Sequence, residues 1–270
     1  MSRELFGRRC AVIGMVHAQA LPGSPHYRLS IPGIIDGACR EARQLAETGV
    51  DALLIENMHD RPYLRGAAGP QVVSVMTAIA CAIRREIDLP CGVQVLAGAN
   101  EEAVAIALAA GLDFIRAEGF VFAHVADEGV IESCAGRLLR ARRSWGADGV
   151  RIFCDIKKKH SSHAITSDVS LAETAKAAEF FCADGVIVTG TATGEPVDIA
   201  DLAAAAEATK LPMLVGSGAS LENIDALFEH ASAMIVGSHF KQDGRWDAPI
   251  DPERVKSFID RVRKLRADAA

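Results

Sequence analysis

Residues 211–238 read LPMLVGSGASLENIDALFEHASAMIVGS, and two short apolar runs in this stretch, Met213–Val215 and Ala233–Val236, each end in Gly-Ser. Glycine lets the backbone approach a ligand closely and adopt a positive φ angle. Two neighbouring turns with outward-pointing N–H groups can form a cup for an anion. In (β/α)₈ barrels, the loops after the seventh and eighth strands commonly hold a phosphate. The stretch therefore predicts the last two strands of such a barrel.

Six earlier apolar runs resemble the buried strands of a parallel sheet. These runs are Cys10–Val16, Ala52–Ile55, Gly92–Leu96, Asp113–Arg116, Val150–Asp155 and Gly185–Val188. Segments with helical spacing separate them, for example 32–48, 71–86 and 131–145. Eight strand–helix units in about 250 residues favour a closed barrel over an open sheet. We therefore expect one α/β domain, a (β/α)₈ TIM barrel, over residues 1–270.

Composition narrows the class of protein. The 270 residues are half hydrophobic, the formal net charge is −6, and no basic patch suggests a nucleic-acid partner. The seven cysteines are scattered and form no Cys-x-x-Cys pair, which is typical of free thiols in a reducing cytoplasm. No apolar run is long enough to span a bilayer. We expect a cytoplasmic homo-oligomer that binds a small phosphorylated metabolite.

The first residues allow a second interpretation. Arg3, Arg8 and Arg9 precede an apolar run, and 18–20 (AQA) resembles a signal-peptidase site. The run is short, however, and Gly14 and His17 interrupt its apolar character. The same run also supplies the first strand that the barrel needs, so we favour the strand.

Polar residues stand where the predicted strands end, and in a TIM barrel these ends face the active site. Side chains alternate with period two along a strand, so polar residues at its end are expected to point into the mouth. Inward parity selects Glu56, Arg116, Glu118, Asp155 and Lys157. Nearby positions add His17, Asn57, Asn100 and Lys159 as substrate-binding residues. The glycine-bearing turns add a predicted phosphate site at Thr189, Gly190, Gly216, Ser217, Gly218, Gly237 and Ser238.

These residue types indicate acid–base chemistry. Glu56 or Asp155 is expected to serve as general acid or base, because a carboxyl group in a crowded mouth can have a raised pKa. Lys157 is expected to stabilise an oxyanion or act as a base or Schiff-base nucleophile, and Arg116 to clamp an anion.

Structural roles remain open for the same residues. Ion pairs at a barrel mouth can be purely structural, and a plain N-cap would explain Asn100. His17 could simply pack beneath the proline-rich loop 21–25. A divalent metal held by His17, Glu56 and Asp155 is a minor alternative, since no close ligand spacing demands it. We expect no required cofactor.

Several motifs together resemble those of the BtpA/SgcQ family. They are 13–17 (IGMVH), 21–25 (LPGSP), 50–57 (VDALLIEN), 155–160 (DIKKKH), 188–194 (VTGTATG), 215–218 (VGSG) and 236–244 (VGSHFKQDG). The resemblance covers nearly the whole chain and implies a TIM barrel of the ribulose-phosphate-binding type. One branch of that family is named for photosystem I biogenesis, as a membrane-associated factor. Another lies with sugar-transport genes and carries the name of an enzyme or nucleosidase.

The chain also departs from the family pattern. His59 stands where glycine is usual, and Gly98–Asn100 lacks the frequent Arg-Asn. Glu118 and Lys157 occupy mouth positions where the family usually has Asn and His. These changes suggest a different substrate.

The sequence thus predicts an enzyme acting on a small phosphorylated sugar or a phosphoribosyl or nucleoside-type metabolite. Its reaction would be isomerisation, carbon–carbon lyase chemistry or N-glycosidic hydrolysis. The alternative is a non-catalytic assembly factor for a membrane protein complex, although no lipid anchor, basic amphipathic helix or membrane span supports it.

Overall fold

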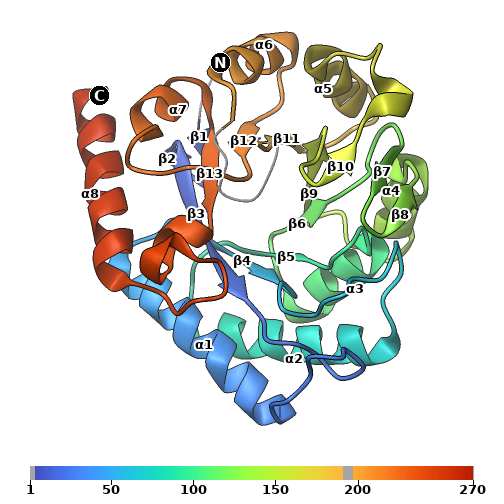
Figure 1. Cartoon of the computed structure of the whole chain (residues 1–270), viewed down its shortest axis with the longest axis vertical. Helices are drawn as coiled ribbons and strands as arrows, with labels where there is room; N and C mark the ends of the chain where they lie inside the picture. The colour runs from blue at the N-terminus through green and yellow to red at the C-terminus, as the bar shows by residue number, and fades with distance from the viewer. Residues whose placement is uncertain (1–3, 191–196, 270) are drawn as a thin grey trace.

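The computed structural model describes residues 4–190 and 197–269, and its centre is a closed barrel of eight parallel strands (Figure 1). The strands follow one another around the ring in the order β11-β12-β13-β3-β4-β5-β6-β9. Their bounds are β3 Ala11–His17, β4 Ala52–Glu56, β5 Cys91–Gln94, β6 Phe114–Ala117, β9 Arg151–Ile156, β11 Gly185–Val188, β12 Met213–Val215 and β13 Ala233–Val236. The predicted TIM barrel is confirmed.

Eight α-helices in the described residues surround the barrel (Figure 1). They are α1 Ile31–Thr48, α2 Pro70–Glu86, α3 Asn100–Ala110, α4 Ala135–Ser144, α5 Leu171–Phe180, α6 Ile199–Ala208, α7 Ile224–His230 and α8 Pro252–Asp268. Within the described ranges, no helix is long and apolar enough to cross a membrane.

Helix ends follow local capping chemistry. Ser170 and Glu173 form a capping box at α5, and Asp198 accepts hydrogen bonds from two N–H groups at the start of α6. Asn100 differs from the expected N-cap: it is the first residue of α3, and its side chain bonds to the backbone of Glu118 instead.

The segment between β6 and α4 is more ordered than expected. It contains a hairpin of β7 (His124–Ala126) and β8 (Gly129–Ile131), and β10 (Ser161–Ser162) pairs with β7. Because the 129–131 backbone is used in this hairpin, α4 begins at Ala135 rather than at Ile131. The small sheet therefore lies beside the carboxyl ends of β6 and β9.

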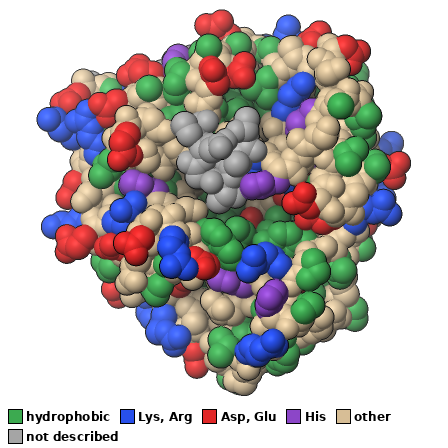
Figure 2. All heavy atoms as spheres, viewed as in Figure 1, with side chains coloured by type: hydrophobic (Ala, Val, Ile, Leu, Met, Phe, Trp, Pro, Cys, Tyr) green, Lys and Arg blue, Asp and Glu red, His purple; other side chains and the backbone are tan. Residues whose placement is uncertain are grey.

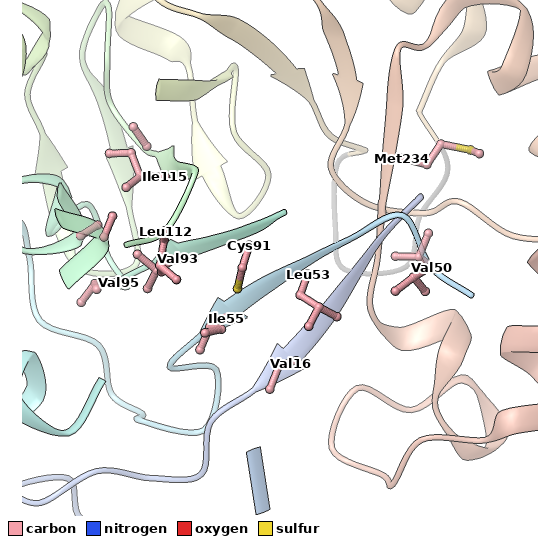
Figure 3. Close-up of a cluster of buried hydrophobic side chains, with 14 of the residues drawn as sticks. Val16, Val50, Leu53, Ile55, Cys91, Val93, Val95, Leu112, Ile115 and Met234 are labelled. Atoms are coloured by element: carbon pink, nitrogen blue, oxygen red, sulfur yellow. The ribbon is translucent and has the colours of Figure 1, made fainter. Parts of the chain in front are cut away.

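Apolar side chains form two layers. The outer layer packs strands against helices, and Figure 3 shows part of it around Leu53, Ile55 and Val93. The inner layer fills the barrel, with the rings of Phe114 and Phe153 5.2 Å apart. Interleaved inward side chains of this kind make a barrel interior a packed core rather than a pore.

A short N-terminal hairpin closes the far end of the barrel. It consists of β1 (Glu4–Leu5) and β2 (Arg8–Arg9), and the sequence analysis did not anticipate it. Phe6 at its tip lies 5.5 Å from Phe114, centroid to centroid, and Arg151 stacks 4.6 Å from the Phe6 ring. The hairpin thus leaves the opposite, carboxyl end as the open one.

Gly92 tests the packing of the inner layer. A Cβ atom at this position would lie 2.3 Å from the Phe114 ring, whereas one at Gly149 would meet nothing within 4 Å. We expect Gly92→Ala to lower the free energy of unfolding by about 1–3 kcal/mol through overpacking. Gly149→Ala should change it by less than about 0.5 kcal/mol. Equal losses for the two variants in urea unfolding would contradict this account.

Candidate active site

A cavity of about 480 Å³ opens at the carboxyl ends of the barrel strands. Figure 2 shows the molecule from this side, with acidic, basic and histidine side chains around the centre of the face. The walls come from the loops after β4, β5, β6, β9, β12 and β13 and from the first turn of α8. The volume lies within the usual range for small-molecule sites.

Arg116 and Asp155 form a bidentate ion pair beneath this cavity. Arg116 Nε donates to Asp155 Oδ2 at 3.0 Å, and Nη2 donates to Oδ1 at 2.9 Å. Burial lowers the pKa of Arg116, but the Asp155 carboxylate more than offsets this and raises it overall. The Asp155 side chain has no exposed surface and does not line the cavity, unlike Arg116. The predicted acid–base role of Asp155 therefore does not fit its position, which is that of a support for Arg116.

Glu118 is held in a second polar cluster. Lys158 Nζ lies 2.9 Å from its Oε2, and Gln94 Nε2 donates to its Oε1 at 3.0 Å. Burial raises the pKa of Glu118, and Lys158 and Arg116 only partly counter this. Lys158 was not among the predicted residues, because strand alternation assigned it to the opposite face.

Asn57 and Asn100 lie behind the cavity wall rather than on it. Asn57 Oδ1 accepts a hydrogen bond from Leu96 N at 2.8 Å and so ties the loop after β4 to the loop after β5. Asn100 Nδ2 donates to the carbonyl oxygen of Glu118 at 2.7 Å, and its Oδ1 accepts from Glu118 N. Neither amide lines the cavity, and both join wall loops to each other.

Glu56 differs from Glu118 and Asp155, because no described residue donates a hydrogen bond to its carboxylate oxygens. Its side chain is buried yet lines the cavity, and His17 Nε2 lies 3.8 Å from its Oε2. Burial raises the pKa of Glu56, and Arg116 and Lys159 counter this only in part. A carboxyl group in this condition can be protonated closer to neutral pH than an exposed glutamate.

His17 also lines the cavity, at the end of β3. Its Nδ1 lies 3.3 Å from the carbonyl oxygen of Trp246, and a carbonyl can only accept, so the proton belongs on Nδ1. Burial lowers the pKa of His17 to about 3 and leaves the ring neutral at physiological pH. The unprotonated Nε2 therefore faces Glu56, where it can accept a hydrogen bond.

Three consecutive lysines follow β9, and their side chains lie in three different environments. The backbone turns at Lys157, where φ is 49°, so the strand alternation does not continue past Ile156. Lys157 Nζ donates to Thr166 O at 3.4 Å beside a separate small pocket, so its predicted place in the mouth is wrong. Lys158 pairs with Glu118, and Lys159 lines the main cavity.

The predicted phosphate cup lines the same cavity at Gly216–Gly218 and Gly237–Ser238. The N–H groups of Ser217, Gly218 and Ser238 donate to no described residue. Gly218 has φ of 72°, and a Cβ at Gly216 would lie 2.5 Å from Ile187. These N–H groups are therefore available to donate hydrogen bonds to an anion in the cavity.

Thr189 and Gly190 brace the walls rather than line the cavity. Thr189 Oγ1 accepts a hydrogen bond from Lys159 N at 3.0 Å, and Gly190 N donates to Ser217 Oγ at 3.1 Å. The remainder of the predicted turn, residues 191–194, lies outside the described residues.

Sequence reasoning missed two further residues in the walls. Arg254, in the first turn of α8, lies near the cup and donates through Nε to His239 O at 2.7 Å. Trp246 follows β13, and its ring lies 5.1 Å from the His59 ring and 4.7 Å from the Arg61 guanidinium. Neither belongs to a strand end, so the rule used to find mouth residues could not select them.

The described side chains contain no group of three or more His, Cys, Asp or Glu placed to hold a metal ion. His17, Glu56 and Asp155, the set considered from the sequence, do not form such a group, because Arg116 occupies the Asp155 carboxylate.

The Arg116–Asp155 pair can be tested by charge removal. Asp155→Asn should lower the free energy of unfolding by about 3–5 kcal/mol, because it leaves a buried guanidinium without its counter-ion. Asp225→Asn breaks an exposed pair with Arg261 and should cost less than about 1 kcal/mol. Urea unfolding of the two variants measures the contrast, and a small loss at Asp155 would remove its structural role.

Comparison with known proteins finds relatives that are similar in sequence and solved structures that share only the fold. The chain is 45% identical to an uncharacterized mitochondrial protein of Caenorhabditis elegans, with 98% of each chain covered. It is 38% identical to the photosystem I biogenesis protein BtpA of a Synechocystis species, over 95% of this chain and 89% of that one. Thiamine phosphate pyrophosphorylase from Pyrococcus furiosus shares the fold at 14% identity, with a TM-score of 0.58 over 95% and 96% of the two chains. The BtpA family model matches residues 8–264, and the chain belongs to the BtpA family.

Proposed function

We propose that this protein is an enzyme that binds a small phosphorylated sugar, or a phosphoribosyl or nucleoside-type metabolite, and catalyses proton transfer with Glu56. The reaction would be an isomerisation, a carbon–carbon lyase reaction or an N-glycosidic hydrolysis. The observation that carries the proposal is the pairing of a buried, unpartnered carboxyl group with a bare N–H cup in one cavity.

The cup supports a phosphate-bearing ligand. Backbone N–H groups that converge in a turn bind anions without any charged side chain. Arg254 lies on the neighbouring wall and can balance the second charge of a phosphate monoester. The structural neighbour from Pyrococcus furiosus is itself named for a phosphate compound, which agrees with this assignment.

Glu56 and His17 support general acid–base chemistry. With its raised pKa, Glu56 can hold or release a proton within reach of a bound ligand. The neutral His17 ring can accept a hydrogen bond from the protonated Glu56 through Nε2 and so orient its carboxyl group. Arg116 presents positive charge to the cavity and would stabilise an oxyanion, while Glu118 would contact substrate hydroxyl groups.

The Synechocystis relative favours a second candidate, a non-catalytic biogenesis factor. The two candidates differ in what the purified protein binds: small phosphates for the enzyme, membrane vesicles or a membrane protein complex for the factor. The desolvated Glu56 favours the enzyme, because an assembly factor has no need to keep a carboxyl group buried without a partner. As an enzyme of small metabolites with free cysteines, it would work in the cytoplasm.

The cup predicts a sharp contrast between two glycines. Gly218 and Gly146 share φ of 72°, but only Gly218 lines the cavity. Gly218→Asp should abolish binding of ribulose 5-phosphate and inorganic phosphate in calorimetry, because it places a carboxylate where the anion would bind. Gly146→Asp carries the same backbone strain and should bind as the wild type does. Unchanged binding by Gly218→Asp would exclude the cup.

Glu56→Gln separates catalysis from stability. Turnover of the phosphosugar substrate should fall by about 10²-fold or more, the usual effect of losing an acid–base group. The free energy of unfolding of Glu56→Gln should exceed that of the wild type at neutral pH. The folded-state pKa of Glu56 is raised, so the wild type loses stability as pH increases from about 4, the unfolded value, through the folded pKa.

The variant lacks this titration, so its advantage should be present at neutral pH and vanish in acid below the unfolded pKa. Thermal unfolding across this pH range gives the test. A variant that is less stable than the wild type at pH 7 would show that Glu56 has a structural partner after all.

A further inference from the structure

The side-chain amine of Lys159 is mostly buried and has no polar partner among the described residues. Its Nζ makes no ion pair or hydrogen bond with a described residue, whereas Lys157 and Lys158 both have partners. Its backbone is fixed by the hydrogen bond from Lys159 N to Thr189 Oγ1, so the side chain starts from a defined point on the cavity wall. A mostly buried ammonium without a counter-ion costs free energy, and such a residue is a candidate for function.

The surroundings favour the neutral, nucleophilic amine. Burial and the nearby Arg116 guanidinium lower the pKa of Lys159, and Glu56, Asp155 and Glu118 only partly oppose this. Arg116 remains charged because Asp155 pairs with it. A desolvated lysine next to another cation is a recurring arrangement in enzymes that form Schiff bases.

The barrel order places Lys159, Glu56 and the cup in three separate sectors around the cavity. Lys159 follows β9, Glu56 ends β4, and the cup follows β12 and β13. In the closed ring, β5 and β6 lie between β4 and β9. On the other side of the ring, β3 lies between β4 and β13, and β11 lies between β9 and β12. A ligand with its phosphate in the cup would therefore extend between an amine on one side and an acid on the other.

We propose that Lys159 is a nucleophile that forms an iminium with the carbonyl group of an open-chain sugar phosphate. This proposal rests on the proposed function, and it narrows the substrate class to aldose or ketose phosphates. It also favours isomerase or lyase chemistry over N-glycosidic hydrolysis, because an iminium withdraws electrons from the neighbouring carbon.

The step balances with groups on the cavity wall. The Lys159 nitrogen lone pair attacks the carbonyl carbon, and the carbonyl oxygen takes a proton from the Glu56 carboxyl group to give a carbinolamine. The nitrogen then releases a proton back to the Glu56 carboxylate. Glu56 protonates the hydroxyl group, the carbon–oxygen bond breaks, and water leaves. The product iminium carries one positive charge, and Glu56 is left as a carboxylate that can remove a proton from the adjacent carbon.

Borohydride trapping tests the proposal on the whole protein. Borohydride reduces an iminium to a stable secondary amine, so the protein should gain the mass of the sugar phosphate less one oxygen atom. Dihydroxyacetone phosphate and ribulose 5-phosphate serve as carbonyl probes, and glycerol 3-phosphate, which has no carbonyl, serves as the blank. We expect one adduct per chain with the carbonyl probes and none with the blank.

Two lysine variants locate the adduct. Lys159→Arg keeps a long basic side chain but cannot form an iminium, so trapping should fall to the level of the blank. Lys157→Arg is the matched control, because Lys157 lies outside the main cavity, and it should trap as the wild type does. Peptide mapping of the wild-type adduct gives the same answer without a variant, should Lys159→Arg fail to fold.

An adduct on Lys159 supports the proposal. An adduct on another lysine, or none with either carbonyl probe while calorimetry shows that both bind in the cup, overturns it and leaves the proposed function standing. Absence of both trapping and phosphate binding would remove the proposed function as well.

Discussion

The mouth of this barrel depends on the ion pair between Arg116 and Asp155. It joins the end of β6 to the neighbouring β9, and it lies where the inner core gives way to the cavity. The guanidinium also points Nη1 at the carbonyl oxygen of Gly216, 3.5 Å away, so the same group touches the turn that begins the cup. A side chain at residue 216 would crowd this guanidinium as well as Ile187. One buried pair thus sets the positions of the cation, the turn at Gly216 and the strand that leads to the lysines.

Charge in the mouth is divided into groups that are paired and groups that are not. Glu118 is paired with Lys158, and Lys241 with Glu41 at 2.6 Å. The Glu41 carboxylate also accepts a hydrogen bond from His17 N, so this second pair fixes the histidine from behind. Within that framework, Glu56 and Lys159 are desolvated ionisable groups whose side chains have no hydrogen-bond partner among the described residues. Such groups lower the free energy of unfolding. A ligand that pairs with them would offset this desolvation cost, and the gain would strengthen binding or lower the activation barrier.

The sequence predicts the barrel well because parallel strands and amphipathic helices leave strong local patterns. The last three strands, Gly185–Val188, Met213–Val215 and Ala233–Val236, have the predicted bounds. The site is predicted less evenly. Period-two alternation correctly directs Glu56 and Arg116 to the cavity, since both are still in a strand. It fails at Lys157, one residue after β9 ends, because a left-handed turn there is a tertiary outcome that alternation does not encode.

The three lysines after β9 also bear on how this site could change. Lys157, Lys158 and Lys159 are chemically identical, yet one bonds to a loop, one neutralises a carboxylate and one reaches the cavity. Deleting any one of them leaves the same shorter sequence, so the mutant chain could fill only two of the three environments. The backbone geometry of the turn, and not which lysine codon was deleted, would decide which of the three environments has no lysine. In this segment, role follows backbone position and not residue identity, so an alignment that matches lysine to lysine does not by itself transfer a function.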